Sequence, residues 1–272
     1  MHLAEFMPPI IHRRLSKLWS TQSPQYSSFA EAERACGPGY QEHELISLVV
    51  EKTRRARQRL QSNTVAEVDL AALRMLPGLD AFGGDQPFNV VDFGGGCGYH
   101  GLIINKALGQ QSRVKWYVIE TPAMVQAAKE MEDENLRFFS SIEEAAKAID
   151  KIHVLYSSGT LQYLPNPCAT LAHLLAIANP QTVRLTRLAL TPLSNDQYFR
   201  QRSNLGSNGP GALPPTFQDR PVNYPLTITS ASQIEATLKL KYQITMKIYE
   251  GDSGYALKNL QVPMLGYIAS RL

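Results

Sequence analysis

An apolar segment at residues 88–93 runs directly into a glycine-rich turn that ends at Gly98. The segment predicts a buried strand, and residues 99 to about 108 predict a helix whose N-terminal N–H groups point back at the turn. Gly94, Gly96 and Gly98 allow positive φ angles and let a ligand approach the backbone closely, because glycine has no Cβ. A strand, turn and helix of this kind predict a binding site for a nucleotide-like cofactor.

The spacing of these glycines distinguishes between two kinds of cofactor. The dinucleotide fingerprint is G-x-G-x-x-G, and its third glycine, counted from Gly94, would occupy the position of Tyr99. This disfavours a nicotinamide dinucleotide. The spacing observed from Asp92 is D-x-G-x-G-x-G, which resembles motif I of class I methyltransferases that bind S-adenosylmethionine (SAM). Asp92 itself would either contact the ligand or hold the turn by accepting backbone N–H bonds.

A carboxylate at the end of the second predicted strand supplies another part of such a site. The strand 114–120 ends at Glu120, which lies 22 residues beyond Gly98. A carboxylate suits a ribose diol because it accepts two hydrogen bonds and donates none. An acid at this place also serves NAD, so Glu120 predicts a nucleoside cofactor in general, while the glycine spacing favours SAM.

Three serines near the ends of the following strands complete the predicted cofactor site. Ser140 and Ser141 follow the third strand and would meet the adenine edge, or would only cap the next helix. Ser157 lies at the end of the fourth strand. We expect it at the site because ligands of open α/β sheets bind beyond the carboxyl ends of the strands.

Strand and helix patterns alternate regularly from residue 88 onward, which predicts a parallel sheet covered on both faces. Residues 242–249 and 262–269 predict two last strands that form an antiparallel hairpin. We therefore expect an α/β, Rossmann-like class I methyltransferase fold with a mostly parallel seven-stranded sheet. The other predicted strands are 88–92, 114–120, 136–139, 151–157 and 182–188, and the helices between them lie near 99–108, 122–132, 141–149 and 165–178.

The domain organisation follows from the same patterns. Residues 1–87 predict a helical N-terminal extension, with a helix from about 41 to 59 and another short helix at 63–75. Residues 88–272 then form the SAM-binding methyltransferase domain. Within it, residues 191–226 are rich in Pro, Gly, Asn and Ser, which predicts either a lid over the acceptor or a disordered insertion loop.

Four motifs in order resemble those of a bacterial group of class I SAM-dependent methyltransferases of undefined substrate. The resemblance spans roughly residues 20–190 and continues weakly through Tyr224-Pro225. It implies SAM as the cofactor. It also implies a small-molecule or carbohydrate-derived acceptor, because such relatives often accompany polysaccharide-building enzymes. One departure is Thr186-Arg187, where an acidic residue is expected beside the arginine. The motifs are D-F-G-G-G-x-G from Asp92, K-W-x-V-x-E from Lys115, S-x-x-L-Q-Y-L-x-x-P from Ser158 and an aromatic segment from Tyr26 to Tyr40.

Methyl transfer from a sulfonium is an in-line displacement, so positioning is the main contribution of the protein. A hydroxyl acceptor also needs a general base. His100, in the first turn of the helix after the glycines, is the first candidate, or it is only a histidine exposed at a helix start. Tyr163 and Arg187 are candidates for acceptor binding. The alternatives to an O-methyltransferase are a catalytically silent scaffold with the same fold and an NAD-dependent oxidoreductase.

Composition limits the expected partners and location. The formal net charge of +3 is too small to imply nucleic acid or an anionic membrane as partner, and we expect the basic run 52–59 to be a solvated helix face. There is no apolar run of about 18 residues and no signal-peptide pattern, so we expect a cytoplasmic protein. Cys36, Cys97 and Cys168 match no zinc or disulfide spacing, and no metal is expected. No pattern specifies an oligomeric state.

Overall fold

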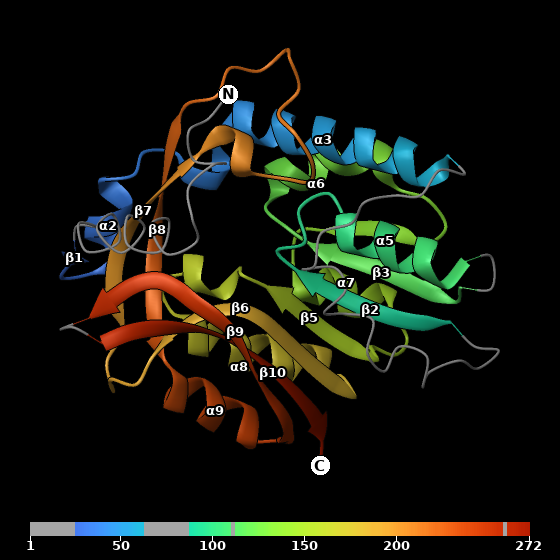
Figure 1. Ribbon diagram of the computed structural model, residues 1–272. Coiled ribbons are helices and arrows are strands. Elements are labelled where there is room, and N and C mark those ends of the chain that lie inside the picture. The colour runs from blue at the N-terminus through green and yellow to red at the C-terminus, as the bar shows by residue number, and fades with distance from the viewer. Residues whose placement is uncertain (1–24, 63–86, 110–111, 258–259) are drawn as a thin grey trace.

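A mostly parallel sheet forms the centre of the fold (Figure 1). The computed structural model describes residues 25–62, 87–109, 112–257 and 260–272. Within them, seven strands follow the order β4–β3–β2–β5–β6–β10–β9. The first five pair in parallel, and β10 is antiparallel to both β6 and β9. The strands are β2 (Phe88–Phe93), β3 (Val114–Ile119), β4 (Leu136–Phe139), β5 (Val154–Ser158), β6 (Thr182–Thr191), β9 (Tyr242–Leu257) and β10 (Leu260–Arg271).

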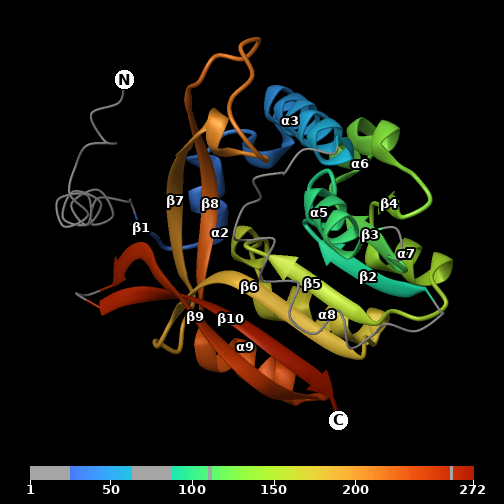
Figure 2. The ribbon, with the colours of Figure 1, turned by 45° about the vertical axis from the view of Figure 1, so that its right-hand side comes forward.

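Helices cover both faces of this sheet, as Figure 2 shows. One core cluster lies between the sheet and α3, α5 and α6, and a second lies between the sheet and α7, α8 and α9. Successive residues Val90 and Val91 of β2 point into these two different clusters and are both fully buried. This explains the continuous apolar run in the sequence, which is typical of parallel strands. The helices are α3 (His43–Gln61), α5 (Tyr99–Leu108), α6 (Pro122–Ala128), α7 (Ile142–Ala148), α8 (Pro167–Ala178) and α9 (Ala231–Lys239).

The described part of the N-terminal extension packs on the rest of the chain. The short helix α2 (Phe29–Arg34) and the 3₁₀ turn η2 (Gly39–Gln41) precede α3. The apolar side of α3 belongs to the same core cluster as β2, β3 and α5, and Leu48 is fully buried there. The short helix predicted at 63–75 lies outside the described residues.

The segment 191–226 contains strands and is therefore not the disordered insertion loop that was one of its two predicted forms. β7 (Gln197–Asn204) and β8 (Pro221–Ser230) form an antiparallel pair, and β1 (Gln25–Tyr26) pairs with β7. The end of β8 pairs with the end of β6, which joins this unit to the central sheet. Alternate residues of β8 are buried, and their burial stabilises the packing of this strand on the rest of the chain. These residues are Val222, Tyr224, Leu226 and Ile228.

A buried lysine fixes the connection between these two strands. Lys52 on α3 is 1% exposed, and its Nζ donates hydrogen bonds of 2.8 Å to the carbonyl oxygens of Gly206 and Asn208. The connection also includes the 3₁₀ turn η7 (Leu205–Ser207). The connection between β7 and β8 is thus held by a side chain of α3 as well as by the pairing of the two strands.

The fold prediction is confirmed. The mostly parallel sheet ends in the antiparallel β9–β10 hairpin, as expected of a Rossmann-like class I methyltransferase fold. The two last strands are longer than the sequence suggested, since β9 extends to Leu257 and β10 to Arg271. Of the helices in the described residues, none is long and apolar enough to span a membrane.

Candidate active site

The glycine turn lies at the carboxyl end of β2, between that strand and α5. Gly94, Gly96 and Gly98 all have positive φ, at 75°, 57° and 77°. A Cβ added at Gly94 would lie 2.2 Å from Thr160, and one added at Gly98 would lie 2.5 Å from Leu136. These two positions therefore require glycine for space as well as for conformation.

Glu120 follows β3 and reaches the glycine turn. Its Oε1 accepts a hydrogen bond of 3.1 Å from the Gly96 N–H, and its Oε2 accepts one of 2.9 Å from the Thr121 N–H. Burial raises the pKa of Glu120, and these two backbone hydrogen bonds oppose the rise. A carboxylate has about four lone-pair sites, so each oxygen keeps capacity for a ligand hydroxyl. The structure thus brings Glu120 and the glycine turn together, as predicted from their spacing.

Asp92 is buried beneath the turn and contacts His100. One carboxylate oxygen, Oδ2, accepts a hydrogen bond of 3.0 Å from the Trp116 indole N–H and lies 3.5 Å from His100 Nδ1. The other, Oδ1, is buried and has no hydrogen-bond partner among the described residues, and the same holds for His100 Nδ1. Asp92 Oδ2 therefore stabilises the fold through its hydrogen bond with Trp116. Oδ1 is available to accept a hydrogen bond from a ligand, because buried polar atoms normally have a partner.

A group of buried hydroxyls beside Asp92 was not predicted from the sequence. The side-chain oxygens of Tyr156, Ser158 and Thr186 are all buried, and the Ser158 and Thr186 hydroxyls lie close enough to Tyr156 to oppose the rise of its pKa. Tyr156 stands opposite Asp92 in the sheet register, and Ser158 stands opposite Thr186. Burial raises the pKa of Tyr156 to about 12, so its hydroxyl keeps its proton at neutral pH. The signal that would have revealed them is the polar residues at alternate positions of β5, on the face that carries Asp92.

The three predicted serines are engaged within the protein. Ser140 Oγ donates to Glu144 Oε2 at 2.7 Å, and Ser141 Oγ accepts from the Glu144 N–H at 3.2 Å, so both cap α7. Ser157 Oγ donates to the Phe93 carbonyl at 3.1 Å and ties β5 to β2. The hydrogen bonds of Ser140 and Ser141 correspond to the capping alternative considered for them.

Tyr163 belongs to a cluster of three tyrosines from distant parts of the chain. It lies in the 3₁₀ turn η6 (Leu161–Tyr163), and its hydroxyl donates to Gln201 Oε1 at 2.8 Å. Its ring centroid is 5.0 Å from that of Tyr40, and Tyr40 stacks on Tyr224 at 4.0 Å. Burial raises the pKa of Tyr40 well above its ordinary value. We call Tyr40, Tyr163 and Tyr224 the tyrosine cluster.

Arg187 lies at the carboxyl end of the parallel part of β6. Its side chain is exposed and its backbone has a φ of 58°. The structure places it near the predicted cofactor site, because Gly159 lies next to it and the neighbouring Thr160 Oγ1 donates to the Gly94 carbonyl at 3.3 Å. His100, Tyr163 and Arg187 therefore all lie on the side of the sheet edge where the glycine turn is found.

Cations of the basic run 52–59 are paired within the chain. Arg54 and Arg55 both form ion pairs with Glu51, and Arg57 forms one with Asp133. Arg54 also pairs with Glu130, which follows α6. This side of α3 therefore ties the extension to the methyltransferase-like domain.

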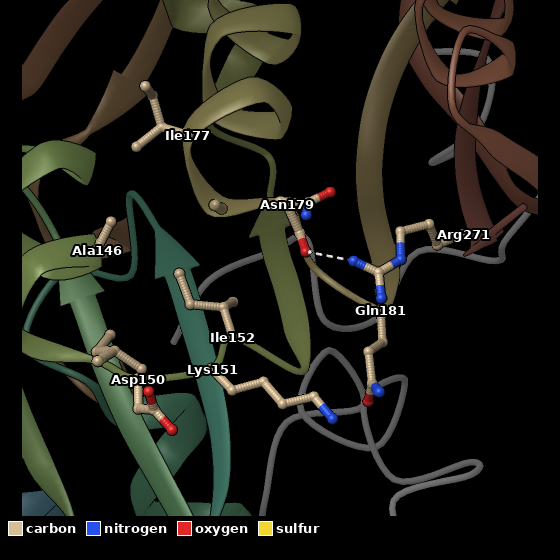
Figure 3. Close-up of a pocket in the computed structure, with 10 residues that line it drawn as sticks. Ala146, Asp150, Lys151, Ile152, Ile177, Asn179, Gln181 and Arg271 are labelled. Carbon is tan, nitrogen blue, oxygen red and sulfur yellow. Dashed lines mark hydrogen bonds between the residues drawn. The ribbon is translucent and has the colours of Figure 1, made fainter.

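A cavity lies at the edge of the sheet opposite the glycine turn, at the amino ends of β5 and β6 (Figure 3). Its volume is about 360 Å³, and Lys151, Gln181 and Arg271 are among the polar residues that line it. Arg271 Nη1 donates to the Asn179 carbonyl at 3.2 Å, at the end of α8. Since ligands of open α/β sheets bind at the carboxyl ends of the strands, this cavity is separate from the candidate active site.

The cysteines and other potential metal ligands do not gather. Cys36, Cys97 and Cys168 all have free thiols. In the residues that the structure describes, no group of three or more His, Cys, Asp or Glu side chains is placed to hold a metal ion.

No protein family and no curated protein matches the chain, whereas solved structures do so at low identity. Magnesium protoporphyrin IX methyltransferase (ChlM) from Synechocystis PCC 6803, with bound S-adenosylhomocysteine (SAH), is 14% identical with a TM-score of 0.48; the match covers 84% of this chain and 99% of that one. The N-terminal domain of EvdMO1 with SAH bound is 13% identical with a TM-score of 0.45, covering 82% and 96%. LepI in complex with SAM is 13% identical with a TM-score of 0.44, covering 83% and 54%. At this identity the likeness concerns the fold, and the function has to be argued from the residues of the chain itself.

Proposed function

We propose that the chain is a SAM-dependent methyltransferase that transfers a methyl group to an oxygen of a small-molecule or sugar-derived acceptor. The observation that carries the proposal is the hydrogen bond between the Glu120 carboxylate and the Gly96 N–H. It joins the predicted ribose-binding acid to the predicted glycine turn in one site. A nucleoside cofactor needs both parts at the same sheet edge.

The residues of the site fit SAM. The glycine turn lets the cofactor approach the backbone, and the Glu120 oxygens accept hydrogen bonds from its ribose hydroxyls. The buried Asp92 Oδ1 has no hydrogen-bond partner and suits a cationic donor such as the cofactor's ammonium group. When bound, SAM supplies an electrophilic methyl group on a sulfonium.

His100 serves as the general base for the acceptor hydroxyl. Asp92 Oδ2 lies 3.5 Å from its Nδ1, so the carboxylate is placed to orient the ring. Because Nδ1 is the ring nitrogen beside Asp92, we assign proton uptake to Nε2. Tyr163 and Arg187 bind and orient the acceptor, and positioning of this kind can supply several kcal/mol of the barrier.

Domain roles follow from this arrangement. Residues 88–272 are the SAM-binding domain, and the β7–β8 unit lies over the acceptor side through Tyr224 of the tyrosine cluster. The extension contributes Tyr40 to the same cluster. An acceptor bound beside the partly exposed Tyr40 and Tyr163 would contact the extension and the SAM-binding domain, whereas Tyr224 is buried.

Calorimetric titration with SAM, SAH and NAD tests the proposal. We expect micromolar binding of SAM and SAH, no binding of NAD, and loss of SAM and SAH binding in Glu120→Ala. The matched control is Glu143→Ala, which removes an exposed glutamate on α7. A folded sample that binds none of the three would be a silent scaffold, and one that binds NAD alone would point to an oxidoreductase.

A further inference from the structure

Arg187 has an unusual backbone conformation for its residue type. In the described ranges, Asn179 and Arg187 are the non-glycine residues with positive φ, at 39° and 58°. Asparagine adopts this region more readily than most residues, and arginine does not share that tendency. Such strain persists where the surroundings impose it, and it is concentrated at functional sites.

A bulge in β6 imposes this conformation. Leu185 pairs with Tyr267 and Leu188 pairs with Leu265, so Thr186 and Arg187 together stand opposite the single residue Gly266. Bulges of this kind occur next to active sites, where they redirect a side chain. Here the redirected side chain is that of Arg187.

A carboxylate on the neighbouring strand fixes the bulge. The Arg187 N–H donates a hydrogen bond of 2.8 Å to Glu250 Oε1. Gly266 makes room for this contact, because a Cβ there would lie 2.7 Å from the same Oε1 atom and 3.0 Å from the Leu185 carbonyl oxygen. Glu250 therefore fixes the backbone of Arg187. In the family motif that the sequence resembles, an acidic residue is instead expected directly beside the arginine in the chain.

The guanidinium of Arg187 lies beside Gly159, in the turn that follows β5. Its Cζ is 3.8 Å from the position of a Cβ built on Gly159. Burial raises the pKa values of Tyr40 and Tyr156, and the positive charge of Arg187 opposes both rises. Arg187 is thus close to the tyrosine cluster on one side and to the buried Tyr156 hydroxyl on the other.

The charge of this guanidinium is not neutralised by the described residues. Arg187 forms a hydrogen bond through its backbone N–H, and its side chain has no hydrogen bond or ion pair within the part of the chain that the structure describes. The side chain is also exposed. A guanidinium presents paired N–H donors whose geometry matches the oxygens of a carboxylate or a phosphate.

We propose that Arg187 determines the acceptor class by binding an anionic group, a carboxylate or a phosphate, of a hydroxylated acceptor whose apolar face lies against the tyrosine cluster. This inference rests on the proposed methyltransferase function. It narrows the acceptor from any small molecule to one with an acidic group near the methylated hydroxyl, such as a sugar acid or a sugar phosphate. The bulge, Glu250 and Gly266 are the parts of the fold that aim the guanidinium at that group.

Binding of small anions to the SAH-loaded full chain tests this inference. The probes are inorganic phosphate, D-glucuronate and D-glucose 6-phosphate, with D-glucose as the neutral comparison, each titrated by ligand-observed NMR. We expect at least one anionic probe to bind and D-glucose to bind at least tenfold more weakly. The carboxylate and phosphate probes together identify which anion is preferred.

Variants distinguish a specific role of the Arg187 side chain from a general effect of positive charge on anion binding. Arg187→Gln is expected to weaken the anionic probe at least tenfold and Arg187→Lys to weaken it less. The matched control Arg202→Gln, which removes the same charge from an exposed position on β7, is expected to change nothing. Unchanged SAH affinity shows that each variant is folded.

The outcomes also separate this inference from the proposed function. If SAH binds and no anionic probe depends on Arg187, the anionic acceptor is wrong and the methyltransferase proposal stands. If an anionic probe depends on Arg187 and the chain does not bind SAH or SAM, the anion site stands and the methyltransferase proposal falls. Equal binding of D-glucose and the anionic sugars also overturns the inference.

Discussion

The carboxylate of Glu120 accepts a hydrogen bond from the backbone N–H of Gly96, and this contact ties the end of β3 to the glycine turn after β2. The two residues follow adjacent parallel strands, β2 and β3, which pair in register from Phe88 opposite Val114 to Phe93 opposite Ile119. Glu120 is half-buried, and burial raises the pKa of its carboxyl group. The site therefore holds a carboxylate in a poorly solvated place, which is costly for folding.

This cost predicts a specific dependence of stability on pH. Burial raises the pKa of Glu120 above its ordinary value of 4.5, so the folded protein binds this proton more tightly than the unfolded chain does. The contribution of Glu120 to stability is then most favourable below pH 4.5 and declines as the pH rises through the folded-state pKa. Urea unfolding of wild type and Glu120→Gln from pH 4.5 to neutral should show wild type losing stability relative to the variant. A constant difference across this range would contradict the raised pKa.

Replacing Gly98 by alanine should unfold or disable the glycine turn. Gly98→Ala adds a Cβ 2.5 Å from Leu136 at a φ of 77°, and we expect it to cost about 2–4 kcal/mol and to abolish SAM binding. Gly109→Ala is the matched control, since Gly109 has a φ of 71° and its Cβ would meet nothing within 4 Å. We expect the control to cost about 1 kcal/mol and to keep SAM affinity. Equal effects of the two changes would show that the Leu136 contact is unimportant.

Lys52→Met tests how the β7–β8 unit is held. The substitution keeps the apolar stem and removes two hydrogen bonds from a charged donor to the Gly206 and Asn208 carbonyls. We expect a loss of about 2–3 kcal/mol in unfolding free energy and faster amide exchange around η7. Arg59→Met, at an exposed position of the same helix, should leave both quantities within about 0.5 kcal/mol of wild type. Unchanged exchange in Lys52→Met would mean that strand pairing alone orders the connection.

The glycine turn and Glu120 could be predicted because their signals are local. An apolar strand, three glycines at fixed offsets and an acid at the next strand end are all visible in short windows of sequence. The cluster of hydroxyls from Tyr156, Ser158 and Thr186 could not be predicted, because it depends on which strands are neighbours and on their register. Pairing of Tyr40 with Tyr224 is similarly a product of the fold.

The β7–β8 pair was missed for a different reason. Val222, Tyr224, Leu226 and Ile228 alternate as a half-buried strand should, but Pro221 and Pro225 interrupt the strand signal and a Gly- and Pro-rich connection precedes it. Pro225 nevertheless lies within β8, and the pairing with β7 continues on both sides of it. Composition alone therefore suggested a loop where the chain forms a sheet.

His100→Gln should separate chemistry from cofactor binding. If His100 is the general base, the rate of methyl transfer falls by about 10²–10⁴-fold while the affinity for SAM is unchanged. His173→Gln, on the exposed side of α8, is the control and should leave the rate unchanged. The measurement is single-turnover transfer from labelled SAM to an acceptor obtained by screening hydroxylated acids and sugar phosphates. A wild-type rate in His100→Gln would assign proton removal to another group or to water.

Arg187→Gly should raise stability while it removes function. Glycine adopts a φ of 58° without the strain that Arg187 bears, so we expect unfolding free energy to increase by about 1 kcal/mol. Arg187→Ala is the control, because it removes the guanidinium and keeps the Cβ that causes the strain. Both variants should lose methyl transfer to the anionic acceptor and keep SAH affinity, but only Arg187→Gly should gain stability in urea unfolding. A stabilised, inactive Arg187→Gly beside an inactive Arg187→Ala of wild-type stability would mean that the chain tolerates backbone strain in order to aim this side chain. If Arg187→Gly were no more stable than Arg187→Ala, the conformation would carry no cost and the bulge would be no sign of function.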